Sequence, residues 1–107
     1  MHWHGILHSR SNNMDGVVHV TQNVIAMGET FVYDFFVDGP GTFWYHAHFK
    51  TQYMAGVRAS LIVLDPSENM YTDRILMLAD WYHEVSPNSQ VYSSSLLASK
   101  IYFPCIS

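Results

Sequence analysis

Apolar and polar residues alternate with a period of two along residues 29–37, where Phe31, Tyr33, Phe35 and Val37 fall on one face of an extended segment. This period predicts a β-strand that buries its aromatic side. A turn signal, Asp-Gly-Pro-Gly, follows at residues 38–41, and the next run rich in β-forming residues then begins. We therefore predict that residues 29–37 pair with this next run, residues 42–48, as a β-hairpin.

Shorter apolar runs predict further strands. Residues 17–21 follow a Met-Asp-Gly turn, and residues 57–64 form a run that ends at Asp-Pro. Between the strands, residues 52–56 predict one irregular or helical turn. Residues 74–79 suit either a strand or a short helix, and their shortness favours a strand. Everything up to residue 64 therefore fits an antiparallel β arrangement.

Composition limits the classes of protein to which the chain can belong. Its 107 residues allow one small domain, and 49% hydrophobic with 15% aromatic residues is a globular composition. A net charge of -4, with only five scattered Lys and Arg residues, excludes a nucleic-acid-binding surface. The apolar runs are too short for a transmembrane segment, and the chain opens with no secretory signal pattern. A single cysteine, Cys105, excludes an intrachain disulfide and a multi-thiolate zinc site.

Two His-x-His pairs carry the candidate chemistry. One is His2 and His4, in His-Trp-His-Gly, and the other is His46 and His48, in Trp-Tyr-His-Ala-His. Residues two apart on a strand project from the same face, so each pair can direct both imidazoles at one point. If the two strands lie side by side, four rings converge. A site built from imidazole alone favours copper or zinc.

The remaining candidate residues have more ordinary interpretations. His8, His19 and His83 have no partner at ligand spacing, so we expect solvated or hydrogen-bonded roles outside the site. Asp15 by itself is a turn residue ahead of Gly16.

Several short sequence motifs follow one another along residues 1–84. They are His2-Trp3-His4-Gly5-Ile6, Met14-Asp15-Gly16-Val17, Val20-Thr21-Gln22, Gly41-Thr42-Phe43-Trp44-Tyr45-His46-Ala47-His48, Gln52-Tyr53, Gly56-Val57-Arg58, Leu61-Ile62-Val63-Leu64-Asp65-Pro66 and Ala79-Asp80-Trp81-Tyr82-His83. Their order and spacing resemble the first cupredoxin domain of multicopper oxidases, the family of laccases and ferroxidases.

This resemblance implies an all-β fold, a cupredoxin-like Greek-key β-sandwich that is incomplete because its opening strands are missing. Residues 1–66 then form a partial first cupredoxin domain that carries the ligand motifs. Residues 67–84 form a linker and the first strand of the next cupredoxin domain, and residues 85–107 form an irregular tail.

The resemblance also implies a copper-dependent oxidase that oxidises phenolic or metal-ion reductants and reduces dioxygen to water at a trinuclear copper centre. By position, His2 matches a ligand of the type 2 copper, and His4, His46 and His48 match ligands of the type 3 pair. Asp15 matches an acidic residue behind the ligands that assists protons and water. A secreted location is implied in the same way.

The chain also departs from the family pattern. Asn23-Val24 replaces the usual Cys-Pro, and Ala47 replaces the usual Ser, but neither change touches a proposed ligand. The His-flanked cysteine of the mononuclear type 1 copper is absent, and Cys105 has no neighbouring histidine to replace it. We therefore expect an amino-terminal fragment that needs the remaining cupredoxin domains and is inactive when isolated.

Two alternatives remain open at this stage. One is a non-redox module that binds zinc or copper through its histidines, and the other is a nonfunctional truncated product whose exposed sheet edges aggregate. Redox-active copper favours the oxidase, whereas colourless zinc binding with hydrolytic activity favours the module.

Overall fold

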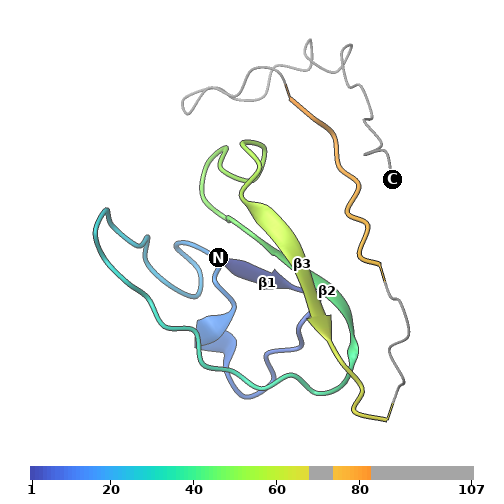
Figure 1. Cartoon of the computed structure of the whole chain (residues 1–107). Coiled ribbons are helices and arrows are strands. Elements are labelled where there is room, and N and C mark those ends of the chain that lie inside the picture. Colours follow the sequence, from blue (N-terminus) through green and yellow to red (C-terminus); the bar gives the residue numbers. More distant parts are fainter. Residues whose placement is uncertain (68–73, 83–107) are drawn as a thin grey trace.

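The structure, a computed structural model, describes residues 1–67 and 74–82 (Figure 1). In chain order its elements are β1 (His2–His4), the 3-10 helix η1 (Asn12–Met14), β2 (Gly41–His46) and β3 (Arg58–Val63). The three strands form one antiparallel sheet in the order β1-β2-β3. The predicted all-β class is confirmed, and this open sheet is consistent with part of a cupredoxin-like sandwich.

Strand β2 is the centre of the sheet and fixes the register of both neighbours. His46 lies opposite His2 on β1 and opposite Arg58 on β3. Because directly opposed residues of antiparallel strands share a face, the even-numbered positions of β1 and β2 face one side. That side carries the histidines, and the other side carries Trp3 and Tyr45.

The aromatic side of the sheet is covered by the extended segment of residues 29–37. The Trp3 ring lies 5.3 Å from the ring of Tyr33, 5.1 Å from that of Phe35 and 5.2 Å from that of Tyr45. These tilted and edge-to-face pairs are the arrangements that aromatic rings prefer. They hold β1 against the rest of the fold although β1 has only three residues.

The prediction that residues 29–37 form a strand paired with residues 42–48 is wrong. The alternation itself is present, because Tyr33 and Phe35 are partly buried while Val32 and Phe36 are exposed. The hairpin is absent because both edges of β2 are already paired, with β1 and with β3. The segment therefore contacts the sheet through side chains rather than through a ladder of backbone hydrogen bonds.

Two shorter predictions also need correction. Residues 17–21 form a turn, in which the Val17 carbonyl accepts hydrogen bonds from the backbone N–H groups of Val20 and Thr21, so they cannot form a strand. Residues 74–79 run extended beside β3 without strand pairing (Figure 1). The turn predicted at residues 52–56 is confirmed. His83 and the predicted tail, residues 85–107, lie outside the described residues.

The buried core of the described part is small. Within residues 1–67 and 74–82, the buried apolar side chains are Ile6 and Ala47. Large apolar residues remain exposed on the loops, including Val20, Met27 and Phe36. No helix among the described residues is long and apolar enough to cross a membrane.

Candidate metal centre

The pairing of β1 with β2 brings the two His-x-His pairs together on one face of the sheet. His2 lies opposite His46, and His4 lies opposite Trp44. The Trp44 indole stacks on the His4 imidazole, with 4.7 Å between ring centroids and 22° between planes. The side-by-side arrangement that the sequence hypothesis requires is therefore present.

Three of the four predicted ligands form a compact group. One nitrogen from each of His2, His4 and His46 lies within 4.8 Å of the other two. Nδ1 of His4 lies 3.3 Å from Nε2 of His46. His46 is buried, His2 is partly buried and His4 is exposed, so the group opens to solvent on the His4 side.

His48 stands at the edge of this group. It follows the end of β2, where the Ala47 N–H donates to the Val57 carbonyl at 2.9 Å and keeps the chain close to β3. The exposed His48 ring lies 5.5 Å from the His2 ring and 5.9 Å from the His46 ring. His2 thus has the three other histidine rings around it.

Backbone carbonyls anchor the second ring nitrogen of two histidines. Nδ1 of His2 lies 2.8 Å from the carbonyl oxygen of Asp15, and Nδ1 of His46 lies 3.0 Å from that of Ala47. A carbonyl only accepts, so in both rings Nδ1 carries the proton and Nε2 keeps its lone pair. Fixing the tautomer in this way is the usual arrangement behind metal-bound histidines.

The environment of His46 favours the neutral ring. Burial lowers the pKa of the His46 imidazole below its ordinary value of 6.5, and the rings of His2, His4 and His48 lower it further. The hydrogen bond with the Ala47 carbonyl acts in the opposite direction. Because metals bind neutral imidazole, a lowered pKa keeps this nitrogen available to an ion in mildly acidic solution.

Asp15 reaches the group from the loop that follows η1. Its carboxylate Oδ1 lies 3.3 Å from Nδ1 of His2, so backbone and side chain of one residue both face that ring. The next residue, Gly16, has φ +79°, and a Cβ there would overlap the Met1 carbonyl. Glycine therefore allows the loop to approach β1 closely enough to place Asp15.

His8, which the sequence hypothesis placed outside the site, lies directly behind Asp15. Its side chain is buried, and its Nε2 lies 3.8 Å from Oδ1 of Asp15. Sequence spacing gave no signal for this contact, because the loop between β1 and η1 brings the two residues together. His19, also placed outside, is exposed, and its only backbone distinction is a φ of +64°.

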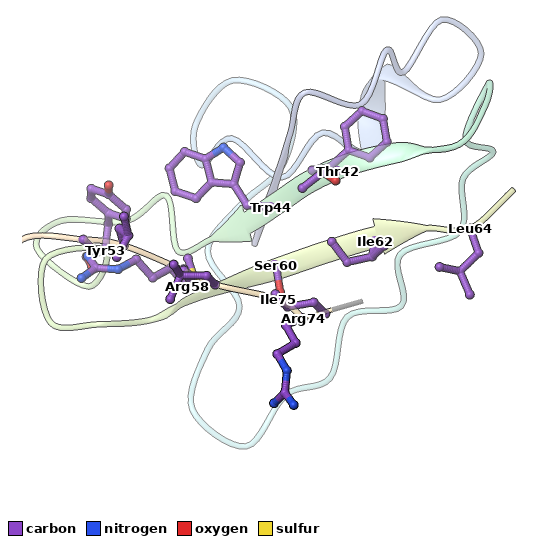
Figure 2. A pocket seen from close by; sticks show the side chains of 14 residues that line it. Thr42, Trp44, Tyr53, Arg58, Ser60, Ile62, Leu64, Arg74 and Ile75 are labelled. Carbon is purple, nitrogen blue, oxygen red and sulfur yellow. The ribbon is translucent and has the colours of Figure 1, made fainter. Parts of the chain in front are cut away.

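A pocket of about 740 Å³ extends along the same face of the sheet and borders the histidine group, because the lining residue Trp44 stacks on His4 and the lining residue Tyr53 lies 5.0 Å from the His46 ring. Figure 2 shows Trp44, Tyr53 and Arg58 at one end and Ile62 and Leu64 at the other. Residues 74–79 form its far wall. The lining is mostly apolar, so this pocket offers packing surface rather than metal ligands.

Comparison with known proteins agrees with this geometry. The sequence profile described as multicopper oxidase matches residues 1–68. The chain belongs to the multicopper oxidase family. Family membership implies copper as the metal, and the imidazole donors of this site fit that ion.

Laccases are among the multicopper oxidases to which this chain is similar. Laccase-1 of Pleurotus ostreatus is 48% identical over 99 residues, which is 85% of this chain and 19% of the relative. Laccase-5 of Trametes versicolor is 46% identical over 91 residues, 78% of this chain and 17% of the relative. Laccase-2 of Agaricus bisporus is 37% identical over 107 residues, which cover 91% of this chain and 21% of the relative. The chain thus spans about a fifth of the length of these relatives.

Proposed function

We propose that this chain supplies part of the copper site of a laccase-like oxidase, with His2, His4, His46 and His48 as ligands. In this proposal His2 binds the type 2 copper of a trinuclear centre, and the other three histidines bind the type 3 pair. The family match and the laccase relatives support the class of enzyme. The geometry of the histidine group supports the ligand set.

The observation that carries the ligand assignment is the 3.3 Å between Nδ1 of His4 and Nε2 of His46. With metal–nitrogen distances of about 2.0–2.1 Å, as in zinc sites, two imidazole nitrogens that share one ion would lie roughly 3–4 Å apart. The two rings are therefore spaced as if they shared one ion. In the metal-free chain the same contact is a hydrogen bond from His4 to His46, because Nε2 of His46 is the acceptor.

The proposed roles of the protein groups follow from these contacts. Bound copper supplies the redox chemistry by which electrons from a reductant reach dioxygen. The carbonyls of Asp15 and Ala47 orient the rings of His2 and His46 and leave one lone pair on each free for the metal. The Asp15 carboxylate, 3.3 Å from His2, is placed to hold a proton beside the cluster.

The wider assignment is also part of this proposal. The natural partners are dioxygen, a small reductant such as a phenol or ferrous iron, and further cupredoxin domains that complete the centre. Residues 1–66 form part of the first cupredoxin domain, and residues 67–84 lead into the next. We propose a secreted protein, by analogy with the laccase relatives.

Metal titration of the 107-residue chain tests the proposal. We expect stoichiometric copper uptake that zinc does not displace at equal concentration, as the higher affinity of imidazole sites for copper predicts. His2→Gln and His46→Gln should each weaken uptake, whereas the control His19→Asn, which removes an exposed histidine away from the group, should not. Uptake unchanged by the first two substitutions, or preference for zinc, would refute the proposal.

A further inference from the structure

The loop between β1 and η1 contains a buried histidine for which neither strand pairing nor the proposed ligand set gives a role. His8 is 7% exposed, and its Nε2 has no hydrogen-bond partner among the described residues. A buried polar nitrogen without a partner costs free energy, about 1–3 kcal/mol in typical cases. Retention of such a group therefore indicates a functional role.

The surroundings of His8 determine which of its nitrogens carries the proton. Nδ1 lies 3.4 Å from the hydroxyl oxygen of Ser11, and the ring packs edge-on against Phe35 at 4.9 Å. When the Ser11 hydroxyl donates to Nδ1, the neutral ring carries its proton on Nε2. That N–H then faces the Asp15 carboxylate, a pure acceptor, at 3.8 Å.

We propose that His8 is a positioning residue for the metal centre. Its Nε2–H holds the Asp15 carboxylate 3.3 Å from Nδ1 of His2, where the carboxylate reinforces the hydrogen bond that the Asp15 carbonyl accepts from the same nitrogen and so favours the tautomer with Nε2 free for the ion. A small side-chain rotation would close the 3.8 Å separation to hydrogen-bond contact. The resulting series of hydrogen bonds runs from Ser11 through His8 and Asp15 to His2, which faces the proposed metal centre.

This inference rests on the proposed function only for the metal itself, because the orientation of His2 is a property of the metal-free chain. Ring-nitrogen NMR spectra of the metal-free chain at pH 8 show directly which nitrogen of the His2 ring carries the proton. We expect the His2 ring to be mainly the tautomer with its proton on Nδ1. In His8→Met, which keeps an apolar side chain of similar size, this population should fall, and in His8→Gln, which keeps an N–H donor, it should recover.

Ser11→Ala provides a second variant that leaves the buried ring in place. Loss of the hydroxyl removes the donor to Nδ1 of His8, so the tautomer with the proton on Nε2 is favoured less strongly. We expect a smaller change at His2 in the same direction. A His2 spectrum unchanged in both His8→Met and Ser11→Ala would overturn the proposal, as would a change that His8→Gln fails to reverse.

Copper affinity provides the functional measurement. Substitutions behind metal ligands typically cost 10–100-fold in affinity, so His8→Met should weaken copper binding about tenfold, while His8→Gln should restore it. Combined with Asp15→Asn, His8→Met should add little, because both act through one carboxylate. Additive losses would contradict the proposed series of hydrogen bonds. If the unsubstituted chain takes up no copper, the proposed function fails, and the His2 spectra still decide the role of His8.

Discussion

At the scale of single residues, two histidine rings of the candidate site, those of His2 and His46, are oriented mainly by the path of the chain. The second nitrogens of His2 and His46 are held by main-chain carbonyls, those of Asp15 and Ala47. A main-chain carbonyl remains in place when the side chain of its residue is replaced. The sequence could therefore supply the candidate ligand types. The orientation of the His2 ring depends on how the loop at Asp15 folds, and that of the His46 ring depends on the path of the chain after β2.

The lowered pKa of His46 predicts a pH dependence of stability. The unfolded ring binds a proton near pH 6.5, whereas the folded ring does so only at lower pH, mainly because it is buried. Between the pKa of the folded ring and about 6.5, the unfolded state binds more protons than the folded state. The free energy of unfolding must therefore fall as the pH falls below about 6.5. Urea titrations of the metal-free chain at pH 7.5 and 5.5 should show lower stability at 5.5. A smaller difference is expected in His46→Gln, and greater stability at the lower pH would contradict the account.

Gly16 allows a second prediction. Alanine at this position combines a positive φ with an overlap of its Cβ with the Met1 carbonyl, so the loop bearing Asp15 has to move away from β1. Backbone strain alone costs roughly 1 kcal/mol, and the overlap adds to it. We therefore expect Gly16→Ala to destabilise the chain by more than about 1 kcal/mol and to weaken copper binding. Gly28→Ala is the matched control, because Gly28 has φ +83° but open space around it. Equal effects of the two substitutions on copper binding would show that the close approach is unimportant.

At the scale of elements, the sequence predicted strands where local pattern decides and failed where partner availability decides. The runs at residues 42–48 and 57–64 correspond to β2 (Gly41–His46) and β3 (Arg58–Val63). Residues 29–37 have an equally clear period but no ladder, because β2 has no free edge for them. The contact between His8 and Asp15 escaped prediction for a similar reason, since tertiary folding of a loop creates it.

The aromatic cover over Trp3 predicts different effects for two neighbouring phenylalanines. Phe35 is partly buried, with its ring 5.1 Å from that of Trp3, whereas Phe36 is 83% exposed. We expect Phe35→Ala to cost about 1–2 kcal/mol, less than truncation of a fully buried phenylalanine. Phe36→Ala should change stability by less than about 0.5 kcal/mol. Chemical denaturation measures both, and a larger loss for Phe36→Ala would mean that the segment faces the sheet with its other side.

At the scale of the whole molecule, a small core and a three-stranded sheet with two outer strands favour marginal stability. Buried apolar side chains are few among the described residues, and unpaired strand edges promote association between chains. A ligand that binds only the folded state stabilises it in proportion to the logarithm of its concentration. Metal binding therefore becomes a large contribution to folding in such a chain.

Copper should accordingly raise the thermal midpoint of the chain. At a free concentration 100 times the dissociation constant the gain is about 2.7 kcal/mol. Circular dichroism melting curves with and without copper measure it, with His2→Gln as the control in which the gain should be reduced. A melting curve without a cooperative transition in either condition would show that the chain does not fold by itself.

In the proposed site, β1 and β2 hold imidazoles from both His-x-His pairs around copper. X-ray absorption spectroscopy of the copper-loaded chain tests it most directly. We expect copper coordinated by several imidazoles, with the number reduced in both His2→Gln and His46→Gln. Coordination without imidazole, or a spectrum unchanged when either histidine is replaced, would contradict it.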